Sequence, residues 1–202
     1  LQKEGVFATG KHFPGHGDTE QDSHKTLPTI DFDEKRIDSV ELYPYKKLIK
    51  DDLSSIMVAH LNVPSLEKRS DYPSSLSNHI VTDILKGSLG FNGLVISDAL
   101  NMKGAADFDE SGEIDLAAFL AGNDILLISE DPVLGIAKIM DAYYNGKITE
   151  ERLEYSVKKI LKAKFKVGLN HYKPIETQNL VEDLNRIKDA SLYEELIENA
   201  LT

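Results

Sequence analysis

Short apolar segments of strand length alternate with amphipathic segments along the first two thirds of the chain. The segments expected to be strands are 5–10, 54–60, 93–99 and 124–129. Each is a nearly continuous apolar run, which indicates burial on both faces, as in a parallel sheet, rather than one face in water. Four strand and helix units in succession therefore predict a parallel α/β fold.

The segments between these strands place apolar residues at helical spacing. A first helix is expected over 33–50, with a break near Pro44, because proline is tolerated only at a helix start or a kink. A second helix is expected to begin after the candidate N-cap Ser77 and to end at Gly90. Two more are expected over 113–121 and 133–144.

The last third of the chain is predicted to be helical. Thr149 is expected to cap a long helix that runs towards Gly168 and packs on the rest of the fold through its apolar stripe. After Pro174, a more acidic helical pattern covers 180–201. The strand and helix units are thus followed by helices alone.

Composition indicates a globular chain and excludes two classes of partner. The 202 residues are 41% hydrophobic, enough to bury a core, and carry a formal net charge of −11. Nucleic acids and anionic membranes need clustered Lys and Arg, so neither is expected as the main partner. There is no cysteine, and no apolar run reaches the roughly 18 residues of a membrane span. No signal peptide opens the chain, but Leu1 is not a natural start, so both the bacterial cytoplasm and the cell envelope stay open.

Polar residues concentrate in 11–24, directly after the first predicted strand. Asp22 and His24 are two positions apart, so in an extended segment the carboxylate can reach the imidazole. Such a carboxylate orients the ring and favours its protonated form, which gives a group that donates and accepts a proton near neutral pH. The alternative is a solvated loop that happens to be rich in His and Asp.

Further polar residues stand at the ends of the other predicted strands. His60 ends the second strand and Asp98 the third, while Lys11 and His12 follow the first. In parallel α/β folds ligands bind at the carboxyl ends of strands, so these side chains are expected to line one site. Asp98 leaves a buried apolar strand directly, as a nucleophile facing an acid/base would; the alternative is an Asp that caps the following helix.

The same residues form motifs that resemble a known family. The motifs are Lys-His-Phe-Pro-Gly-His-Gly-Asp-Thr from Lys11, Asp-Ser-His from Asp22, Ala59-His60 and Ser97-Asp98-Ala99-Leu100. They resemble the β-N-acetylglucosaminidase branch of glycoside hydrolase family 3, and the resemblance runs in order to about Asn170. It implies a retaining glycosidase that removes terminal β-linked N-acetylhexosamine from peptidoglycan- or chitin-type glycans, without a cofactor.

The resemblance also assigns roles to the residues. Asp98 would form a covalent glycosyl-enzyme, and His24, oriented by Asp22, would be the acid/base. The substrate-binding residues would be Lys11, His12 and His60. Adjacent strand residues point to opposite faces, so the first two can both reach the sugar only if the strand ends or bulges there.

The family fold is a TIM-type (β/α)8 barrel, of which this chain has only four units. We therefore interpret 1–170 as the second half of the catalytic barrel and 171–202 as a helical tail leading towards a following domain. The expected partners are then the glycan substrate, the missing N-terminal half of the barrel and a downstream domain of the parent chain.

Two other functions fit parts of the pattern. A metal-dependent hydrolase could use a ligand set of His12, His16, Asp18, Asp22 and His24. The set contains no His-x-x-x-His pair on a predicted helix, which disfavours a metal-dependent hydrolase. A non-catalytic glycan-binding fragment is the other alternative, because half of the barrel is missing. A phosphate-cradling loop is excluded, since no Gly-x-x-x-x-Gly-Lys-Ser/Thr occurs.

Overall fold

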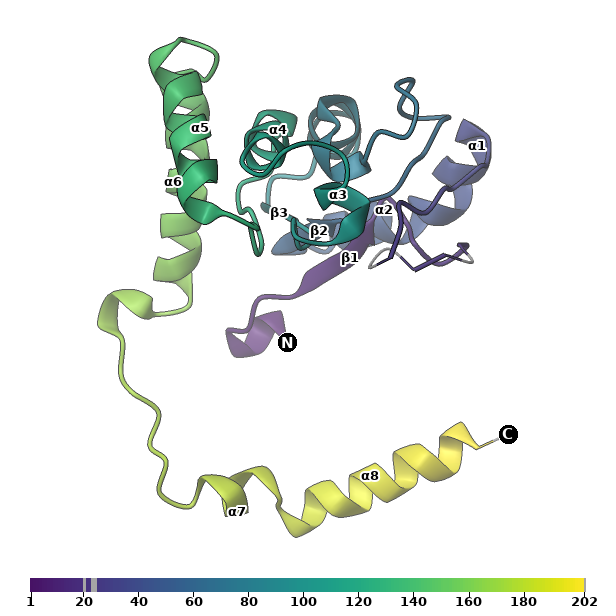
Figure 1. Ribbon diagram of the computed structural model, residues 1–202. Coiled ribbons are helices and arrows are strands. Elements are labelled where there is room, and N and C mark those ends of the chain that lie inside the picture. The colour runs from purple at the N-terminus through teal and green to yellow at the C-terminus, as the bar shows by residue number, and fades with distance from the viewer. Residues whose placement is uncertain (20, 23–24, 202) are drawn as a thin grey trace. The chain divides into compact units, whose positions relative to one another are not determined.

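A parallel three-stranded sheet organises the fold, in the strand order β1, β2, β3 (Figure 1). The strands are β1 (Thr9–Phe13), β2 (Ser55–Val58) and β3 (Leu94–Ser97). The computed structural model describes residues 1–19, 21–22 and 25–201. It divides into two units, Leu1–Val167, which holds the sheet, and Gly168–Thr202. The predicted parallel α/β architecture is confirmed for the first unit.

The first strand lies later in the chain than predicted. A 3-10 turn over Gln2–Glu4 ends at Gly5, which takes a left-handed conformation with φ 80°, and Val6 is 52% exposed. The strand therefore begins only at Thr9 and contains Lys11 and His12 instead of ending before them.

The pairing of β1 with β2 is irregular at these two polar residues. Gly10 faces Ile56 and Phe13 faces Val58, so Lys11 and His12 together lie opposite the single residue between Ile56 and Val58. Two residues opposite one is a β-bulge, which turns side chains away from their regular alternation. The Lys11–His12 and Phe13–Pro14 peptide bonds are both cis.

The fourth predicted strand, 124–129, is reduced to a short extended stretch beside β3. Ile125 forms an isolated parallel bridge with Ile96, and Ser97 N donates to the Ile125 carbonyl at 3.0 Å. The stretch stops because Ile128 has φ 44°, which takes the backbone out of the extended region.

The first predicted helix is divided into three parts. They are α1 (Glu34–Arg36), the π-helical segment η2 (Ile37–Glu41) and α2 (Tyr43–Lys50). Asp33 caps the start by accepting from Arg36 N at 2.8 Å. The π-helical segment gives way to the α-helix α2 at Leu42, so Pro44 lies in the first turn of α2. There its missing N–H breaks no hydrogen bond.

The remaining helices of the first unit follow the predicted order. The second helix is the π-helical segment η4 (His79–Ser88), and the Ser77 hydroxyl accepts from Ile80 N at 3.2 Å. Thr149 caps the last one by accepting from Arg152 N at 3.2 Å. The other elements are η3 (Ser74–Leu76), α3 (Lys103–Ala106), α4 (Glu113–Ala121), α5 (Pro132–Tyr144) and α6 (Glu150–Lys166).

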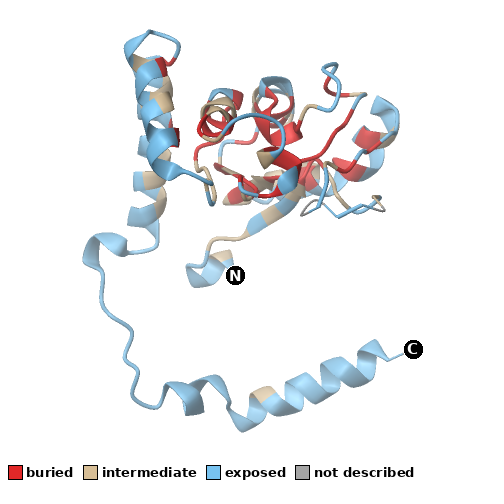
Figure 2. Ribbon diagram, viewed as in Figure 1, coloured by how far each residue is buried: buried red, intermediate tan, exposed pale blue. Residues whose placement is uncertain are grey.

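Buried residues concentrate on the strands and on the helix faces turned towards them (Figure 2). The main core joins Phe13, Ile56 and Val95 of the strands with Ile80 and Leu85 of η4, all at most 2% exposed. Burying each such side chain is worth about 1.5–3 kcal/mol relative to leaving it in water.

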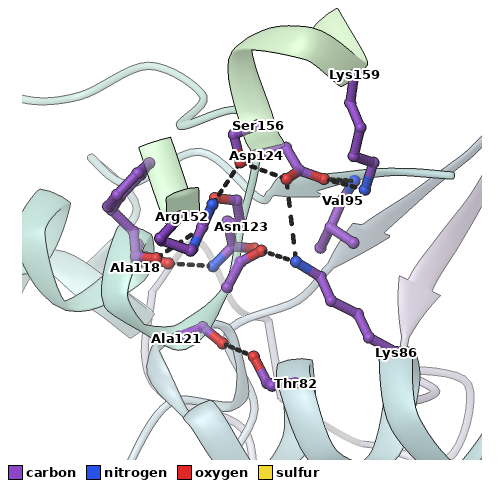
Figure 3. Close-up of polar contacts among 12 residues, drawn as sticks. Thr82, Lys86, Val95, Ala118, Ala121, Asn123, Asp124, Arg152, Ser156 and Lys159 are labelled. Carbon is purple, nitrogen blue, oxygen red and sulfur yellow. Dashed lines mark hydrogen bonds and ion pairs between the residues drawn. The ribbon is translucent and has the colours of Figure 1, made fainter. Parts of the chain in front are cut away.

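A buried carboxylate ties α6 to the start of β3 (Figure 3). Asp124 accepts from Ser156 Oγ at 2.5 Å, from Lys159 Nζ at 2.6 Å and from Val95 N at 3.0 Å. Lys86 Nζ of η4 lies 3.9 Å from the same carboxylate. Because Val95 is near the start of its strand, this network lies at the opposite end of the sheet from the strand tips.

The second unit contains the 3-10 helix η5 (Leu169–His171), α7 (Leu180–Leu184) and α8 (Ile187–Ala200). The single helix predicted over 180–201 is divided at Asn185, which has φ −123° and ψ 49°. The unit is exposed almost throughout (Figure 2). In the described part of the chain, no helix is long and apolar enough to cross a membrane.

Candidate active site

A cavity of about 1010 Å³ opens at the carboxyl ends of the strands. Its walls come from β1, the loop after β1, the α1 to α2 segment and the end of β3. The lining residues that this section discusses are Lys11, His12, Gly15, His16, Asp18, Asp22, Arg36, Glu41 and Asp98. The cavity therefore lies where the strand-end argument places the ligand site of a parallel sheet.

Asp98 is held at the tip of β3 with its carboxylate at the cavity wall. Its N–H donates to the Val58 carbonyl at 2.8 Å, and its Oδ1 accepts from Ala99 N at 2.9 Å. Oδ2 lies 3.8 Å from His12 Nε2. The side chain is 12% exposed. One oxygen is thus fixed by the backbone while the other faces an imidazole in the cavity.

Both Lys11 and His12 line the cavity, which the bulge in β1 makes possible. The ring of His12 contacts His16 edge-on, with centroids 6.1 Å apart and the planes at 73°. His16 Nδ1 in turn lies 3.0 Å from the Thr19 hydroxyl. Lys11, His12 and His16 thus give the cavity a polar wall, in which His12 lies nearest to the Asp98 carboxylate among the contacts described.

Asp22 also lines the cavity, as the predicted acid/base arrangement requires. Its carbonyl accepts from Lys25 N at 2.9 Å and from Thr26 N at 3.2 Å. His24 lies outside the described residues, so its predicted contact with Asp22 stays a prediction.

The structure does not bring His60 into the cavity. This residue is fully buried, and Nε2 donates to the Ala99 carbonyl at 3.0 Å while Nδ1 accepts from the Ser75 hydroxyl at 2.6 Å. Burial lowers the pKa of His60 and favours the neutral ring, which has one donor and one acceptor. The expected direct contact with substrate is therefore replaced by a link from the end of β2 to the residue after Asp98.

Two charged residues of the cavity, Arg36 and Glu41, were missed by the sequence argument, which considered Asp18 only as a candidate metal ligand. Arg36 Nη1 donates to Glu41 Oε1 at 2.5 Å and to Oε2 at 2.6 Å, and Nη2 donates to Asp18 Oδ2 at 2.9 Å. In an α-helix, residues five apart point about 140° away from each other. An α-helical interpretation of 33–50 therefore gives no signal that Arg36 and Glu41 form a pair.

A metal site built on this loop finds no support in the structure. Asp18 is bound to Arg36, and His16 to Thr19. Over residues 1–19, 21–22 and 25–201, no three His, Asp or Glu side chains are grouped so that they could hold a metal ion.

Together these features define an α/β protein whose polar cavity, at the tips of a parallel sheet, places a carboxylate opposite histidine and lysine. The model described as "Glycosyl hydrolase family 3 N terminal domain" matches residues 1–163. The chain therefore belongs to glycoside hydrolase family 3.

Individual relatives agree with this membership. The chain is 34% identical over 189 residues to β-hexosaminidase A of Pseudoalteromonas piscicida, covering 83% of this chain and 31% of that protein. It is 36% identical over 132 residues to a β-hexosaminidase of Methylobacillus flagellatus, covering 65% of this chain and 37% of the relative. The chain thus spans about a third of the length of these curated relatives.

Solved structures give the same fold. A glycoside hydrolase family 3 β-N-acetylglucosaminidase from Paenibacillus sp. str. FPU-7 superposes with a TM-score of 0.82 at 35% identity, covering 87% of this chain and 34% of that chain. A β-glucoside phosphorylase superposes with a TM-score of 0.86 at 27% identity, covering 94% of this chain and 36% of that chain.

Proposed function

We propose that this chain carries the catalytic residues of a retaining glycosidase that removes terminal β-linked N-acetylhexosamine. One observation carries the proposal: a carboxylate at the tip of β3 has one oxygen bound to backbone and the other 3.8 Å from His12 in a polar cavity. The names of the relatives, β-hexosaminidase and β-N-acetylglucosaminidase, support the substrate class.

The reaction would proceed in two steps. In the first, an oxygen of Asp98 attacks the anomeric carbon, the glycosidic C–O bond breaks, and His24 donates its proton to the leaving oxygen. In the second, neutral His24 takes a proton from water, whose oxygen attacks the same carbon and releases Asp98. Asp22 would orient the imidazole, and Lys11 and His12 would hydrogen-bond the hydroxyls of the sugar.

The remaining site residues would act indirectly. His60 would fix the Ala99 carbonyl and thereby the backbone that holds Asp98, because its ring spans Ser75 and Ala99. The second step depends more on the acid/base residue than on the hydrogen bonds of His60, because water attacks slowly unless a base removes its proton.

We also propose that the chain acts as the second half of a (β/α)8 barrel. The sheet order leaves β1 at an edge, and the relatives are about three times longer than the part matched. Further strands of a parent chain would pair with that edge and supply the sugar contacts that come from earlier units.

The nucleophile assignment is tested by trapping the glycosyl-enzyme. In the complete enzyme, a 2-deoxy-2-fluoro glycosyl or a 5-fluoro N-acetylglucosaminyl inactivator with a good leaving group is expected to label Asp98, because the fluorine slows the second step. Asp98→Ala should lower turnover of an aryl N-acetyl-β-glucosaminide by on the order of a thousandfold or more. Asp107→Ala, which removes an exposed carboxylate at the end of α3, is the matched control and should keep full activity. A label on another residue would contradict the assignment.

A second acceptor is conceivable because one similar structure is a β-glucoside phosphorylase. The same trapping experiment therefore includes inorganic phosphate. Release of free N-acetylhexosamine supports the hydrolase, while release of a sugar 1-phosphate would assign phosphate, in place of water, as the acceptor in the second step.

A further inference from the structure

The loop that follows β1 is fastened at two points to the continuous helical segment formed by α1 and η2, residues 34–41. Asp18 Oδ2 of the loop accepts from Arg36 Nη2 at 2.9 Å. Three residues earlier, Gly15 lies against Glu41, where an added Cβ would stand 2.7 Å from both Cβ and Cγ of that side chain. Both contacts join the cavity loop to the same short helical segment, and all four residues line the cavity.

Arg36 is the central residue of this connection, because its guanidinium binds Glu41 through Nη1 and the loop residue Asp18 through Nη2. Nη1 donates to both carboxylate oxygens of Glu41, whose side chain is only 6% exposed. The guanidinium carbon also lies 4.7 Å from the centre of the Phe32 ring. A planar guanidinium fixed by a buried carboxylate and a ring presents its remaining donors in a set direction.

The π-helical turn explains how the pair forms. Leu42 N donates to the Ile37 carbonyl at 2.9 Å, the i to i+5 pattern that widens a helix. In this wider turn, residues five apart come nearer to the same face than they do in an α-helix. The turn therefore lets Arg36 bind Glu41 and still face Asp18.

Gly15 is the second, independent part of the fastening. With φ 145° it has a backbone conformation that side chains rarely adopt, and its lack of a Cβ lets the loop approach Glu41 closely. Any larger residue would push the start of the loop away from η2.

We propose that Arg36 is a positioning residue of the active site: anchored on Glu41, it holds Asp18 and so fixes the loop that leads from His12 to Asp22. The inference deepens the proposed function, since its kinetic consequence assumes that this loop carries the acid/base pair. Arg36 itself touches no reacting atom in that scheme. Its contribution is to restrict where the proton donor can stand relative to Asp98.

The test compares Arg36→Gln, Arg36→Lys and Asp18→Asn with a matched control, Arg69→Gln. Arg69 donates to the buried Glu67 at 2.7 Å and 3.0 Å, and its guanidinium lies 3.4 Å from the Tyr72 ring centre, outside the cavity. Arg69→Gln therefore removes a similar ion pair and ring contact but leaves the contacts between Arg36, Glu41 and the loop in place.

Two readouts are measured on each variant of the complete enzyme. Amide hydrogen exchange over residues 15–22 reports the fastening and needs no activity. Steady-state kinetics with an alkyl and a dinitrophenyl N-acetyl-β-glucosaminide report proton donation, because only the alkyl leaving group needs to be protonated.

Arg36→Gln should speed exchange in the loop by about tenfold or more and lower kcat/KM for the alkyl substrate by about tenfold to a hundredfold. For the dinitrophenyl substrate, kcat/KM should change by less than about threefold, because kcat/KM reports the first step and this leaving group needs no proton there. Arg36→Lys should rescue neither readout, because one ammonium does not reproduce the fork, and Asp18→Asn should behave like Arg36→Gln. Arg69→Gln should leave loop exchange and the ratio of the two substrates unchanged.

Unchanged loop exchange in Arg36→Gln would overturn the inference, whatever the kinetics. Faster exchange with equal losses for both substrates would also overturn it, since the fastening would then not serve proton donation. A wild-type enzyme that cleaves neither substrate would contradict the proposed function, and loop exchange alone would then decide whether Arg36 fastens the loop.

Discussion

Asp98 and Asp22 line the same cavity, but the surroundings of these two carboxylates suit different tasks. Asp98 has one oxygen bound to Ala99 N and is 12% exposed, so it stays in one orientation at the tip of β3. Asp22 belongs to the loop, whose conformation depends on contacts such as the one between Asp18 and Arg36. A fixed group suits attack on carbon, and a group on a loop suits a proton donor that must serve both steps.

In the first step, the acid/base pair is predicted to matter only when the leaving group needs a proton. His24→Ala and Asp22→Asn should lower kcat/KM for alkyl N-acetyl-β-glucosaminides by about a hundredfold or more, and change dinitrophenyl substrates little in the first step. The matched control is the exposed pair of His79 and Asp83, which are 2.9 Å apart on η4. His79→Ala should leave both substrates unaffected. Equal losses for the two substrates in His24→Ala would remove the pair from the mechanism.

At the scale of single residues, the sequence predicts which side chains line the cavity where their position relative to a strand end decides this. Lys11, His12, Asp22 and Asp98 all come to one cavity because the tips of parallel strands meet at one edge. It fails for His60, since two hydrogen bonds made by residues far along the chain keep that ring buried. Neither bond has a signal in the local sequence.

At the scale of elements, the apolar pattern locates helices and strands but not their local irregularities. The α4 bounds, Glu113–Ala121, match the prediction, because both its ends are marked by glycine. The β1 bulge and the π-helical turn η2 were not predicted, as each depends on pairing or packing with another segment. These two irregular elements supply Lys11, His12 and Glu41 of the cavity wall.

The attachment of α6 predicts a particular pH dependence of stability. Lys86 donates to the Gly122 carbonyl and lies 3.9 Å from Asp124, with Lys159, Arg152 and Tyr155 of α6 around it. Burial lowers its pKa from 10.5 to about 8, although Asp124 acts in the opposite direction. Between those values the unfolded chain binds more protons than the folded one, so the free energy of unfolding should rise with pH.

Lys86→Met removes this titration and is the direct test. From pH 8 to 10.5, wild type should gain on the order of 2 kcal/mol of unfolding free energy relative to Lys86→Met, measured by urea unfolding. Lys162→Met, an exposed lysine of α6, is the matched control and should keep the wild-type slope. Parallel slopes for wild type and Lys86→Met would show that Lys86 does not titrate differently in the folded chain.

At the scale of the whole molecule, the decisive feature is that the sheet is open. With β1 at one edge and only a bridge beside β3 at the other, the described strands form an open sheet rather than a closed one. The four predicted strand segments account for β1, β2, β3 and the bridge at Ile125, so none of them is left to pair with the β1 edge.

The 202-residue chain alone is therefore predicted to be a weak catalyst that associates or packs loosely. An unpaired strand edge and uncovered apolar faces favour association, and a displacement of about 1 Å in a site can lower the rate on the order of a hundredfold. The measurement compares this chain with one extended upstream by a further half barrel. It follows hydrolysis of 4-methylumbelliferyl N-acetyl-β-glucosaminide and the molecular mass in solution. A monomer with full activity would show that the open sheet is complete as it stands, and that the cavity residues described here suffice for the reaction.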